Sequence, residues 1–255
     1  MSAKVYFLSD SHLGIPDHSS SLSREKKLVR WLDHVKRDAA AIYLLGDIFD
    51  FWFEYRNVVP KGYVRLLGKL AELSDSGIPI HYFTGNHDMW VFEYFEKELG
   101  LIMHKDPADV EIFGKKFHIG HGDGLGPGDK GYKLLKSVFA CRFCQRLFAA
   151  LHPGIGMRLA GYFSKKSRLA NKPDEEVFLG EDKEWLVIYS KEVLGKQDVD
   201  YFIYGHRHVP VNIEIAPGVR YLNTGDWFHH YSYAVFDGDT IELQTFTDAH
   251  PAKDH

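Results

Sequence analysis

Residues 201–208 read Tyr-Phe-Ile-Tyr-Gly-His-Arg-His, an apolar run that ends in a glycine and two histidines one residue apart. A short run rich in β-branched and aromatic residues that stops at glycine is typical of a buried strand. In extended backbone alternate side chains point to the same side, so we expect His206 and His208 to share one face. The stretch predicts a strand that presents two imidazoles at its end.

Four other stretches repeat this pattern of an apolar run followed by a metal-binding type of side chain. The runs 5–8, 41–45, 78–84 and 116–120 lead in that order to Asp10 and His12, to Asp47, to Asn86 and His87, and to His121. Loops at strand ends are where α/β folds commonly carry their chemistry. We therefore expect these side chains to meet at one site.

The residue types fit divalent metal ions. Hard or borderline divalent ions take oxygen and imidazole ligands, and a shared carboxylate lets two of them lie ~3.5–4 Å apart. Asp10 and His12 are spaced to hold one ion together. The chain has 15 histidines, and we interpret the other ten as core or surface residues.

The length and composition are typical of one soluble globular domain. The chain has 255 residues, of which 45% are hydrophobic and 26% charged, with a net charge of −4. Helical periodicity over residues 22–37 and 63–76 alternates with the first strands and predicts an α/β fold. We expect one domain, residues 1–255, with two sheets and a helical cap inserted at about 129–180. The N-terminal apolar run stops at Ser9, and no run reaches ~18 apolar residues, so we expect a cytoplasmic protein.

The predicted cap is strongly basic. Residues 130–173 contain no Asp or Glu, which favours an anionic partner for this segment. An apolar stripe accompanies the cations and suits a surface that meets anionic lipid, although it could equally pack on the core with the lysines solvated outside. The cations are Lys130, Lys133, Lys136, Arg142, Arg146, Arg158, Lys165, Lys166, Arg168 and Lys172. The stripe comprises Leu134, Leu135, Val138, Phe139, Phe143, Leu147, Phe148 and Leu151.

Within the cap, Cys141 and Cys144 form a C-x-x-C pair without a second pair. Such a pair is redox-active or half of a zinc site in some proteins, but zinc needs about four ligands. We interpret both as inert residues inside a helix over 133–151. A break at Pro153 and a further helix over 174–194 complete this part of the prediction.

The five stretches together resemble the signatures of the calcineurin-like metallophosphoesterases. They are Asp10-Ser11-His12, Gly46-Asp47, Gly85-Asn86-His87-Asp88, Gly120-His121 and Gly205-His206-Arg207-His208. The resemblance implies a β-sandwich flanked by helices with a dinuclear centre. It implies that Asp10, His12 and His208 hold one ion, that Asn86, His121 and His206 hold the other, and that Asp47 bridges them. Manganese is the expected metal, with iron or zinc as alternatives.

Such a centre would cleave a phosphate ester or anhydride. Two cations lower the pKa of a shared water, and the resulting metal-bound hydroxide attacks phosphorus. His87 follows the ligand Asn86 and precedes Asp88, which would hold it charged, so we expect His87 to protonate or stabilise the leaving oxygen. The alternative is that His87 only supports the ligands.

A narrower resemblance, to the UDP-2,3-diacylglucosamine hydrolases of lipid A biosynthesis, covers nearly the whole chain. It is carried by residues 129–132, Ser167, 170–171, 205–210 and 225–227. It implies cleavage of the pyrophosphate of a nucleotide-linked glycolipid at the inner membrane face, which releases UMP and 2,3-diacylglucosamine 1-phosphate. The implied substrate contacts are Asn86, His87, Asp129, Tyr132, Ser167, Asn171 and His206. The chain departs from that pattern at His87, where the family has arginine, and at Asp174, where it has lysine.

Two other interpretations remain open. One is a soluble phosphodiesterase or phosphatase that acts on nucleotides or nucleic acid, with the basic segment binding phosphates. The other is a scaffold that has kept the fold and lost the chemistry. The leading interpretation has as partners the glycolipid and, through the basic cap, an anionic membrane surface at the inner membrane; it requires no nucleic acid and no obligate protein partner.

Overall fold

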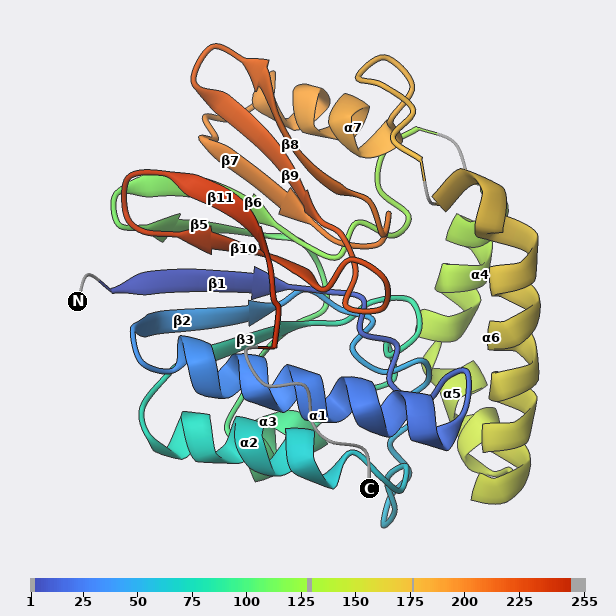
Figure 1. Cartoon of the computed structure of the whole chain (residues 1–255). Helices are drawn as coiled ribbons and strands as arrows, with labels where there is room; N and C mark the ends of the chain where they lie inside the picture. The colour runs from blue at the N-terminus through green and yellow to red at the C-terminus, as the bar shows by residue number, and fades with distance from the viewer. Residues whose placement is uncertain (1–2, 128–129, 176, 249–255) are drawn as a thin grey trace.

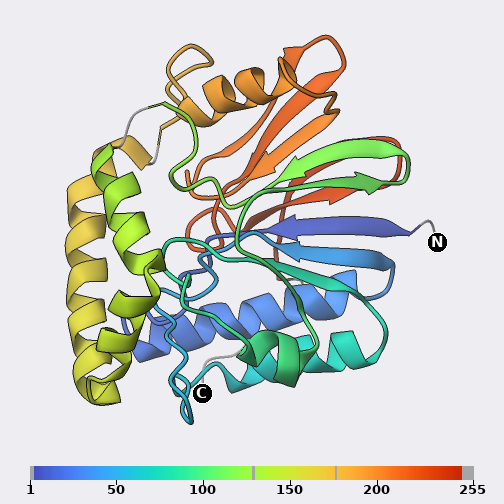
Figure 2. The same cartoon turned by 180° about the vertical axis from the view of Figure 1, so that it is seen from behind.

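The computed structural model describes residues 3–127, 130–175 and 177–248, without the side chains of 130–131 and 165–175. Two β-sheets lie face to face, and helices cover the outer face of each (Figures 1 and 2). The predicted two-sheet α/β fold is confirmed. A separate group of helices stands across one end of this sandwich.

Within the described residues the first sheet has six strands in the order β11-β10-β1-β2-β3-β4. Pairs β1–β2, β2–β3 and β3–β4 are parallel, whereas β10 joins β1 and β11 in antiparallel fashion. Because parallel neighbours end on the same edge, the loops after β1, β2 and β3 meet there. The strands are β1 (Lys4–Leu8), β2 (Ala39–Leu44), β3 (Ile80–Phe83), β4 (Ile102–His104), β10 (Ser232–Phe236) and β11 (Ile241–Thr245).

The second sheet has five described strands in the order β5-β6-β7-β9-β8. Its central pairs β6–β7 and β7–β9 are parallel, so β6 and β7 also end side by side. The loops that follow β6 and β7 carry the remaining predicted metal ligands. The strands are β5 (Ala108–Ile112), β6 (Lys115–Ile119), β7 (Tyr201–Tyr204), β8 (Pro210–Ala216) and β9 (Val219–Thr224).

Strand β1 shows why these strands are apolar along their whole length. Val5 and Phe7 point between the sheets, where Phe7 stacks on Tyr43 of β2 and on Phe117 of β6 at centroid distances of 5.1 and 6.0 Å. Tyr6 and Leu8 point the other way into the helical layer. Both faces of the strand are buried, so period-2 alternation of polar residues is absent.

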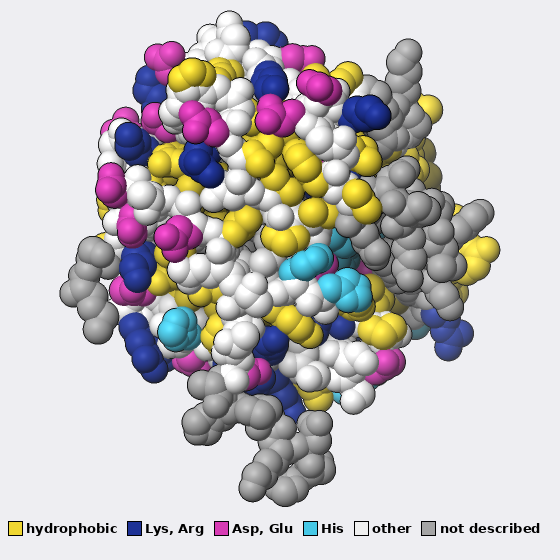
Figure 3. Space-filling model, turned by 45° about the horizontal axis from the view of Figure 1, so that its top comes forward, with side chains coloured by type: hydrophobic (Ala, Val, Ile, Leu, Met, Phe, Trp, Pro, Cys, Tyr) yellow, Lys and Arg dark blue, Asp and Glu magenta, His cyan; other side chains and the backbone are white. Residues whose placement is uncertain are grey.

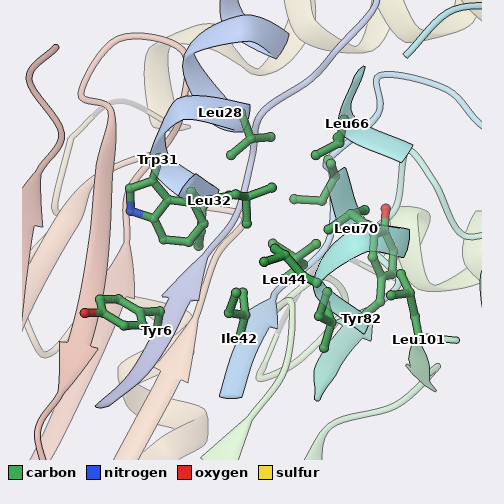
Figure 4. Packing of buried hydrophobic residues seen from close by; sticks show 14 of the residues in the cluster. Tyr6, Leu28, Trp31, Leu32, Ile42, Leu44, Leu66, Leu70, Tyr82 and Leu101 are labelled. Carbon is green, nitrogen blue, oxygen red and sulfur yellow. The ribbon is translucent and has the colours of Figure 1, made fainter. Parts of the chain in front are cut away.

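Helices α1 (His18–Val35), α2 (Val64–Asp75) and α3 (Tyr94–Leu99) cover the first sheet. Asp17 caps α1, because its side chain accepts a 2.9 Å hydrogen bond from the Ser20 backbone N–H. Leucines and Trp31 of α1 and α2 point onto β1, β2 and β3 (Figure 4). Helix α7 (Trp185–Leu194) covers the second sheet through residues such as Leu186 and Val187.

Helices α4 (Lys130–Ala140), α5 (Arg142–Ala149) and α6 (Pro153–Glu175) lie beside the carboxyl ends of β1 and β2 (Figures 1 and 2). We call these three helices the cap. They fall within the predicted insertion, and its boundaries stay a prediction. No described helix is both long and apolar enough to traverse a lipid bilayer.

Two helix predictions were wrong. The helix expected over 133–151 is interrupted at Cys141, which has extended backbone (φ −68°, ψ 118°) and precedes α5. The helix expected from residue 174 begins only at Trp185, because Gly180 adopts φ +88°, a conformation that ends helices. Pro153 is the first residue of α6, where its missing N–H costs no helical hydrogen bond.

Candidate metal centre

The predicted ligands lie in loops with unusual backbone geometry. Left-handed backbone costs a non-glycine residue about 1–2 kcal/mol, and such strain concentrates at functional sites. Of the eight non-glycine residues described with positive φ, five are predicted metal ligands. They are Asp10 (53°), His12 (41°), Asp47 (53°), His206 (69°) and His208 (54°).

One cluster of ligand atoms forms at the ends of β1 and β7. Asp10 Oδ1 lies 3.2 Å from His208 Nε2 and 3.8 Å from His12 Nε2. The two imidazole nitrogens are 3.2 Å from each other. Ligands around one ion with bonds of about 2.1 Å stand roughly 3–3.5 Å apart, so this spacing suits three ligands of one cation.

A second cluster lies at the ends of β2, β3 and β6 and shares a carboxylate with the first. Asp47 Oδ2 lies 3.3 Å from His121 Nε2 and 3.8 Å from His12 Nε2. Asn86 Oδ1 lies 3.2 Å from His121 Nε2. His206 joins Asp47 and His121 in a group whose ligand atoms are all within 4.8 Å of one another. Asp47 thus stands between the two groups of side chains.

In three of the ligands, Asp10, Asp47 and His121, the protein holds the second polar atom of the side chain. The backbone N–H of His206 donates to Asp10 Oδ2 at 2.9 Å, and that of His87 donates to Asp47 Oδ1 at 2.8 Å. His121 Nδ1 lies 2.7 Å from the Leu45 carbonyl oxygen, which places the proton on Nδ1 and leaves Nε2 as a donor to metal. These three ligands are therefore oriented before any ion binds.

Two glycines permit this close packing. A Cβ on Gly46 would lie 2.7 Å from the Gly85 backbone nitrogen, and Gly46 itself has φ +87°. A Cβ on Gly85 would collide with the carboxylate and backbone of Asp47. Any side chain at either position would push the loops after β2 and β3 apart.

The electrostatics of the site call for added positive charge. Burial raises the pKa of Asp10 and of Asp47, but neighbouring histidines outweigh it and lower both values, so two carboxylates are charged in the interior. Burial alone would lower the pKa of His121, yet Asp47 raises it to about 10. Asp10 Oδ1 is buried and accepts no hydrogen bond from the described residues. A lone pair left unpaired beside two imidazoles fits a bound cation.

His87 lies next to this cluster but is oriented by a residue the sequence did not reveal. Its Nδ1 is 2.9 Å from the Asp50 carbonyl oxygen and 3.8 Å from Asp50 Oδ1. Asp50 Oδ1 is also 3.4 Å from His12 Nδ1. Asp50 follows Asp47 by three residues, a spacing that could have marked it.

The expectation that Asp88 holds His87 charged was wrong, because Asp88 binds other groups. Asp88 accepts hydrogen bonds from the backbone N–H of Ile48 and of Gly85 at 2.9 and 2.8 Å and from the Tyr82 hydroxyl at 2.5 Å. Burial and the charge of Asp47 raise the pKa of Asp88 to about 6. Asp88 therefore ties the loop after β2 to the loop after β3.

Other supporting residues were also missed. Arg24 of α1 is buried and donates to the carbonyl oxygens of Ser11 and His12 at 3.2 and 2.9 Å, so it stabilises the strained loop after β1. Arg207 lies between the two histidines of its motif and forms a buried ion pair with Glu184 at 2.7 Å. The chain offers no local pattern that marks such partners, because each pair is distant in sequence.

A cavity of about 650 Å³ opens beside the cluster at Asn86 and His87 and extends under the cap. Its walls are mostly apolar and come from the loops after β2 and β3 and from all three cap helices. Among the lining residues are Phe51, Trp90, Leu135, Phe139, Phe148, Leu159 and Phe163. The predicted apolar stripe is therefore divided, since Phe139 and Phe148 line the cavity whereas Leu134, Phe143 and Leu147 are exposed.

The predicted substrate contacts have different outcomes. Asn86, His87 and His206 lie at the cluster, and Tyr132 lines the cavity while its hydroxyl donates to Asp123 at 2.5 Å. Lys136 reaches the same carboxylate at 2.7 Å, so Asp123 joins α4 to the loop after β6. Asp129 lies outside the described residues, and so do the side chains of Ser167 and Asn171. Their substrate roles stay predictions.

This fold and cluster belong to one known family. Residues 3–210 match the family model described as calcineurin-like phosphoesterase, and the chain is a member of that family. A UDP-2,3-diacylglucosamine hydrolase of Porphyromonas gingivalis is 40% identical over 97% of this chain and 99% of its own length. Its counterpart from Aeromonas hydrophila is 28% identical over 90% of this chain and 92% of its own length. A solved phosphoesterase from E. coli aligns with a TM-score of 0.47 and 16% identity over 95% of this chain and 92% of its own.

Divalent metal binding should release protons from this site. Without metal, the pKa of His121 is about 10, so the ring is protonated near pH 7, whereas a metal ligand needs a free lone pair. We expect affinity to rise by about tenfold per pH unit below pH 9. Titration calorimetry in buffers of different ionisation enthalpy measures the released protons.

His121→Gln removes the titrating ring and provides the control. Its binding enthalpy should depend less on the buffer than that of the native chain. Equal buffer dependence in both proteins would contradict the assignment of the released proton to His121.

Proposed function

We propose that this chain hydrolyses the pyrophosphate bond of UDP-2,3-diacylglucosamine and releases UMP and 2,3-diacylglucosamine 1-phosphate. The observation that carries the proposal is the apolar cavity that begins at Asn86 and His87 and runs under the cap. A phosphate held at the clustered ligands would place a lipid portion directly into that cavity. The near full-length similarity to hydrolases of this substrate supports the same reaction.

The size and chemistry of the cavity favour an acylated substrate over a nucleotide alone. Apolar surface buried in such a pocket contributes about 25 cal/mol per Å², so two acyl chains gain many times what a ribose gains. Phosphates would not gain from walls built of Phe139, Phe148 and Leu159. The cavity therefore selects for the lipid half of the substrate.

The centre would hold two divalent ions, with manganese as the proposed metal. Asp10, His12 and His208 would hold one ion, Asn86, His121 and His206 the other, and Asp47 would bridge them. Bound there, two cations supply the charge that lowers the pKa of a water and neutralises phosphoryl oxygens.

His87 would handle the proton of the leaving group. The backbone carbonyl oxygen and the Oδ1 atom of Asp50 both face His87 Nδ1. We therefore assign a proton to Nδ1, which leaves Nε2 as the nitrogen available to the substrate. A protonated Nε2 would donate to the oxygen that leaves phosphorus, which lowers the barrier to departure. The hydrolase pattern that the sequence resembles has arginine at the position of His87, and both residue types can donate to that oxygen.

The substrate is tested with the manganese-loaded protein, UDP-2,3-diacylglucosamine in detergent micelles, and the small ester bis(p-nitrophenyl) phosphate. We expect UMP release from the glycolipid. Leu135→Asp, which places a charge in the cavity, should lower kcat/KM for the glycolipid at least about tenfold and leave the small ester unaffected.

The matched control is Leu134→Asp, one residue away, which is 69% exposed and does not line the cavity. It should keep glycolipid turnover near the native level in micelles. Rapid hydrolysis of the small ester or of soluble nucleotides, with no UMP from the glycolipid, would instead support a soluble phosphodiesterase or phosphatase.

The number of ions and the role of Asp47 are tested together by metal analysis. We expect two manganese ions per native chain and one in His121→Ala, because only the second cluster loses a ligand. Asp47→Asn should retain fewer manganese ions than His121→Ala, because it weakens both clusters at once. Most activity is lost in each variant. Equal metal content in all three proteins would refute the ligand assignment.

The outer face of the cap would bind the inner membrane from the cytoplasmic side. Phe143 and Leu147 of α5 are 66% and 57% exposed, and Arg142 and Arg146 are exposed beside them. Exposed apolar residues next to cations suit an anionic lipid surface. On the face drawn in Figure 3, by contrast, acidic and basic side chains are interspersed.

Sedimentation with vesicles of phosphatidylglycerol and phosphatidylethanolamine tests this surface. The double variant Phe143→Asp and Leu147→Asp should bind at least about tenfold more weakly, since it removes apolar contacts and adds repelled charge. Val64→Asp, at a 72% exposed position on α2, is the control and should bind as the native chain does. Unchanged binding of the double variant would exclude this face.

A further inference from the structure

Ser164 of α6 connects the cap to the residues that orient the reaction. It lines the cavity, and its hydroxyl donates a 2.9 Å hydrogen bond to Asp50 Oδ2. The hydroxyl oxygen of Ser164 also lies 3.3 Å from His87 Nδ1. Sequence position gives no hint of this contact, because Ser164 and Asp50 are 114 residues apart.

Among the described residues, the carboxylate that Ser164 contacts also lies beside two histidine rings. Asp50 Oδ1 lies 3.4 Å from His12 Nδ1 and 3.8 Å from His87 Nδ1, and its side chain is only 7% exposed. The two rings themselves pack edge to face with centroids 4.8 Å apart. The orientation of one buried carboxylate therefore affects a proposed metal ligand and the proposed proton donor together.

The terminal torsion of an aspartate is soft, and its two oxygen atoms exchange readily unless a partner fixes them. The Ser164 hydroxyl occupies Oδ2 and so leaves Oδ1 directed at the two histidines. Loss of that hydrogen bond removes one constraint on the carboxylate, so the acceptor that faces the nearby imidazoles is held less firmly.

We propose that Ser164 is a positioning residue through which the seated cap holds Asp50, and with it His87, in the geometry needed for bond cleavage. The inference rests on the proposed phosphoester hydrolysis and deepens it. Cap and chemistry are then coupled, because α6 must be in place for the Asp50 carboxylate to be fixed. A substrate that fills the cavity and stabilises α6 also stabilises the reactive arrangement.

A contact between Ser164 and the lipid substrate alone would produce a different result. In that case loss of the hydroxyl would weaken glycolipid binding and leave a small ester untouched. If Ser164 positions Asp50, the defect must also appear with a substrate that has no acyl chain. Bis(p-nitrophenyl) phosphate is such a probe.

The test measures kcat and KM of the full-length, manganese-loaded protein for the small ester and for the glycolipid. Ser164→Ala should lower kcat about tenfold for both, as expected for one lost hydrogen bond to a charged group, with KM for the ester nearly unchanged. Ser164→Thr keeps the hydroxyl and should restore most of kcat. Ser137→Ala, an exposed serine of α4 that bonds only to the Lys133 carbonyl oxygen among the described residues, should have no effect.

A double-mutant cycle with Asp50→Asn identifies the route of the effect. In that background Ser164→Ala should cause little further loss, because the carboxylate it fixes is gone. If the fold reductions in kcat of the two single variants simply multiply in the double variant, the proposal is overturned. A normal kcat of Ser164→Ala on the ester with a raised KM for the glycolipid would overturn it too.

A readout without turnover separates this inference from the proposed substrate. In histidine-labelled protein, the ¹⁵N signal of His87 Nδ1, assigned with His87→Gln, should shift in Ser164→Ala and stay in place in Ser137→Ala. This result stands even if the glycolipid proves not to be the substrate. An unmoved Nδ1 signal in Ser164→Ala would refute the positioning role.

Discussion

Two ionised carboxylates, Asp10 and Asp47, lie fully buried at the ends of adjacent parallel strands, and the surrounding structure depends on neutralising them. Burial of an unpaired charge costs several kcal/mol, so cationic partners must surround each one. Five histidines converge there, and in the absence of metal the charged form of His121 is stabilised by Asp47. The same requirement explains why the nearby backbone tolerates left-handed geometry at five ligand positions. Bound divalent ions would neutralise the carboxylates, and their binding free energy would offset the cost of the left-handed backbone.

The loops that carry these ligands are fixed mainly by contacts from outside the cluster. Asp88 joins the loops after β2 and β3, Arg24 binds the carbonyl oxygens of the loop after β1, and Glu184 holds Arg207 between two ligands. Asp88, Arg24 and Glu184 are buried charged groups with hydrogen-bond partners. Removal of one of them would leave its buried partners without a hydrogen bond. The centre is therefore rigid before ions arrive. Such preorganisation is what electrostatic catalysis of phosphoryl transfer requires.

Much of the fold and the cluster was predictable, because strands buried on both faces and their terminal polar residues leave local patterns. The run 201–208 predicted β7 and two imidazoles at its end in this way, but not on extended backbone, since His206 and His208 are left-handed and belong to different clusters. Edge strands such as β4 and β8 carry weaker patterns, and their bounds were not predicted. The break at Cys141 and the late start of α7 at Trp185 depend on tertiary contacts and one positive-φ glycine. Arg24 and Ser164 were missed because no local pattern marks their partners and only the folded chain brings them together, whereas the spacing of Asp50 from Asp47 could have marked Asp50.

The cap provides much of the cavity wall, yet none of the seven proposed metal ligands comes from it. In the proposed function, recognition of the lipid and activation of water would therefore be encoded in different segments of the chain. Substitutions along α4–α6 can reshape the space for an acyl chain while the strand-end loops stay intact. A lineage could in this way adapt the enzyme to longer, shorter or branched fatty acids in its own membrane without rebuilding the part that breaks the bond.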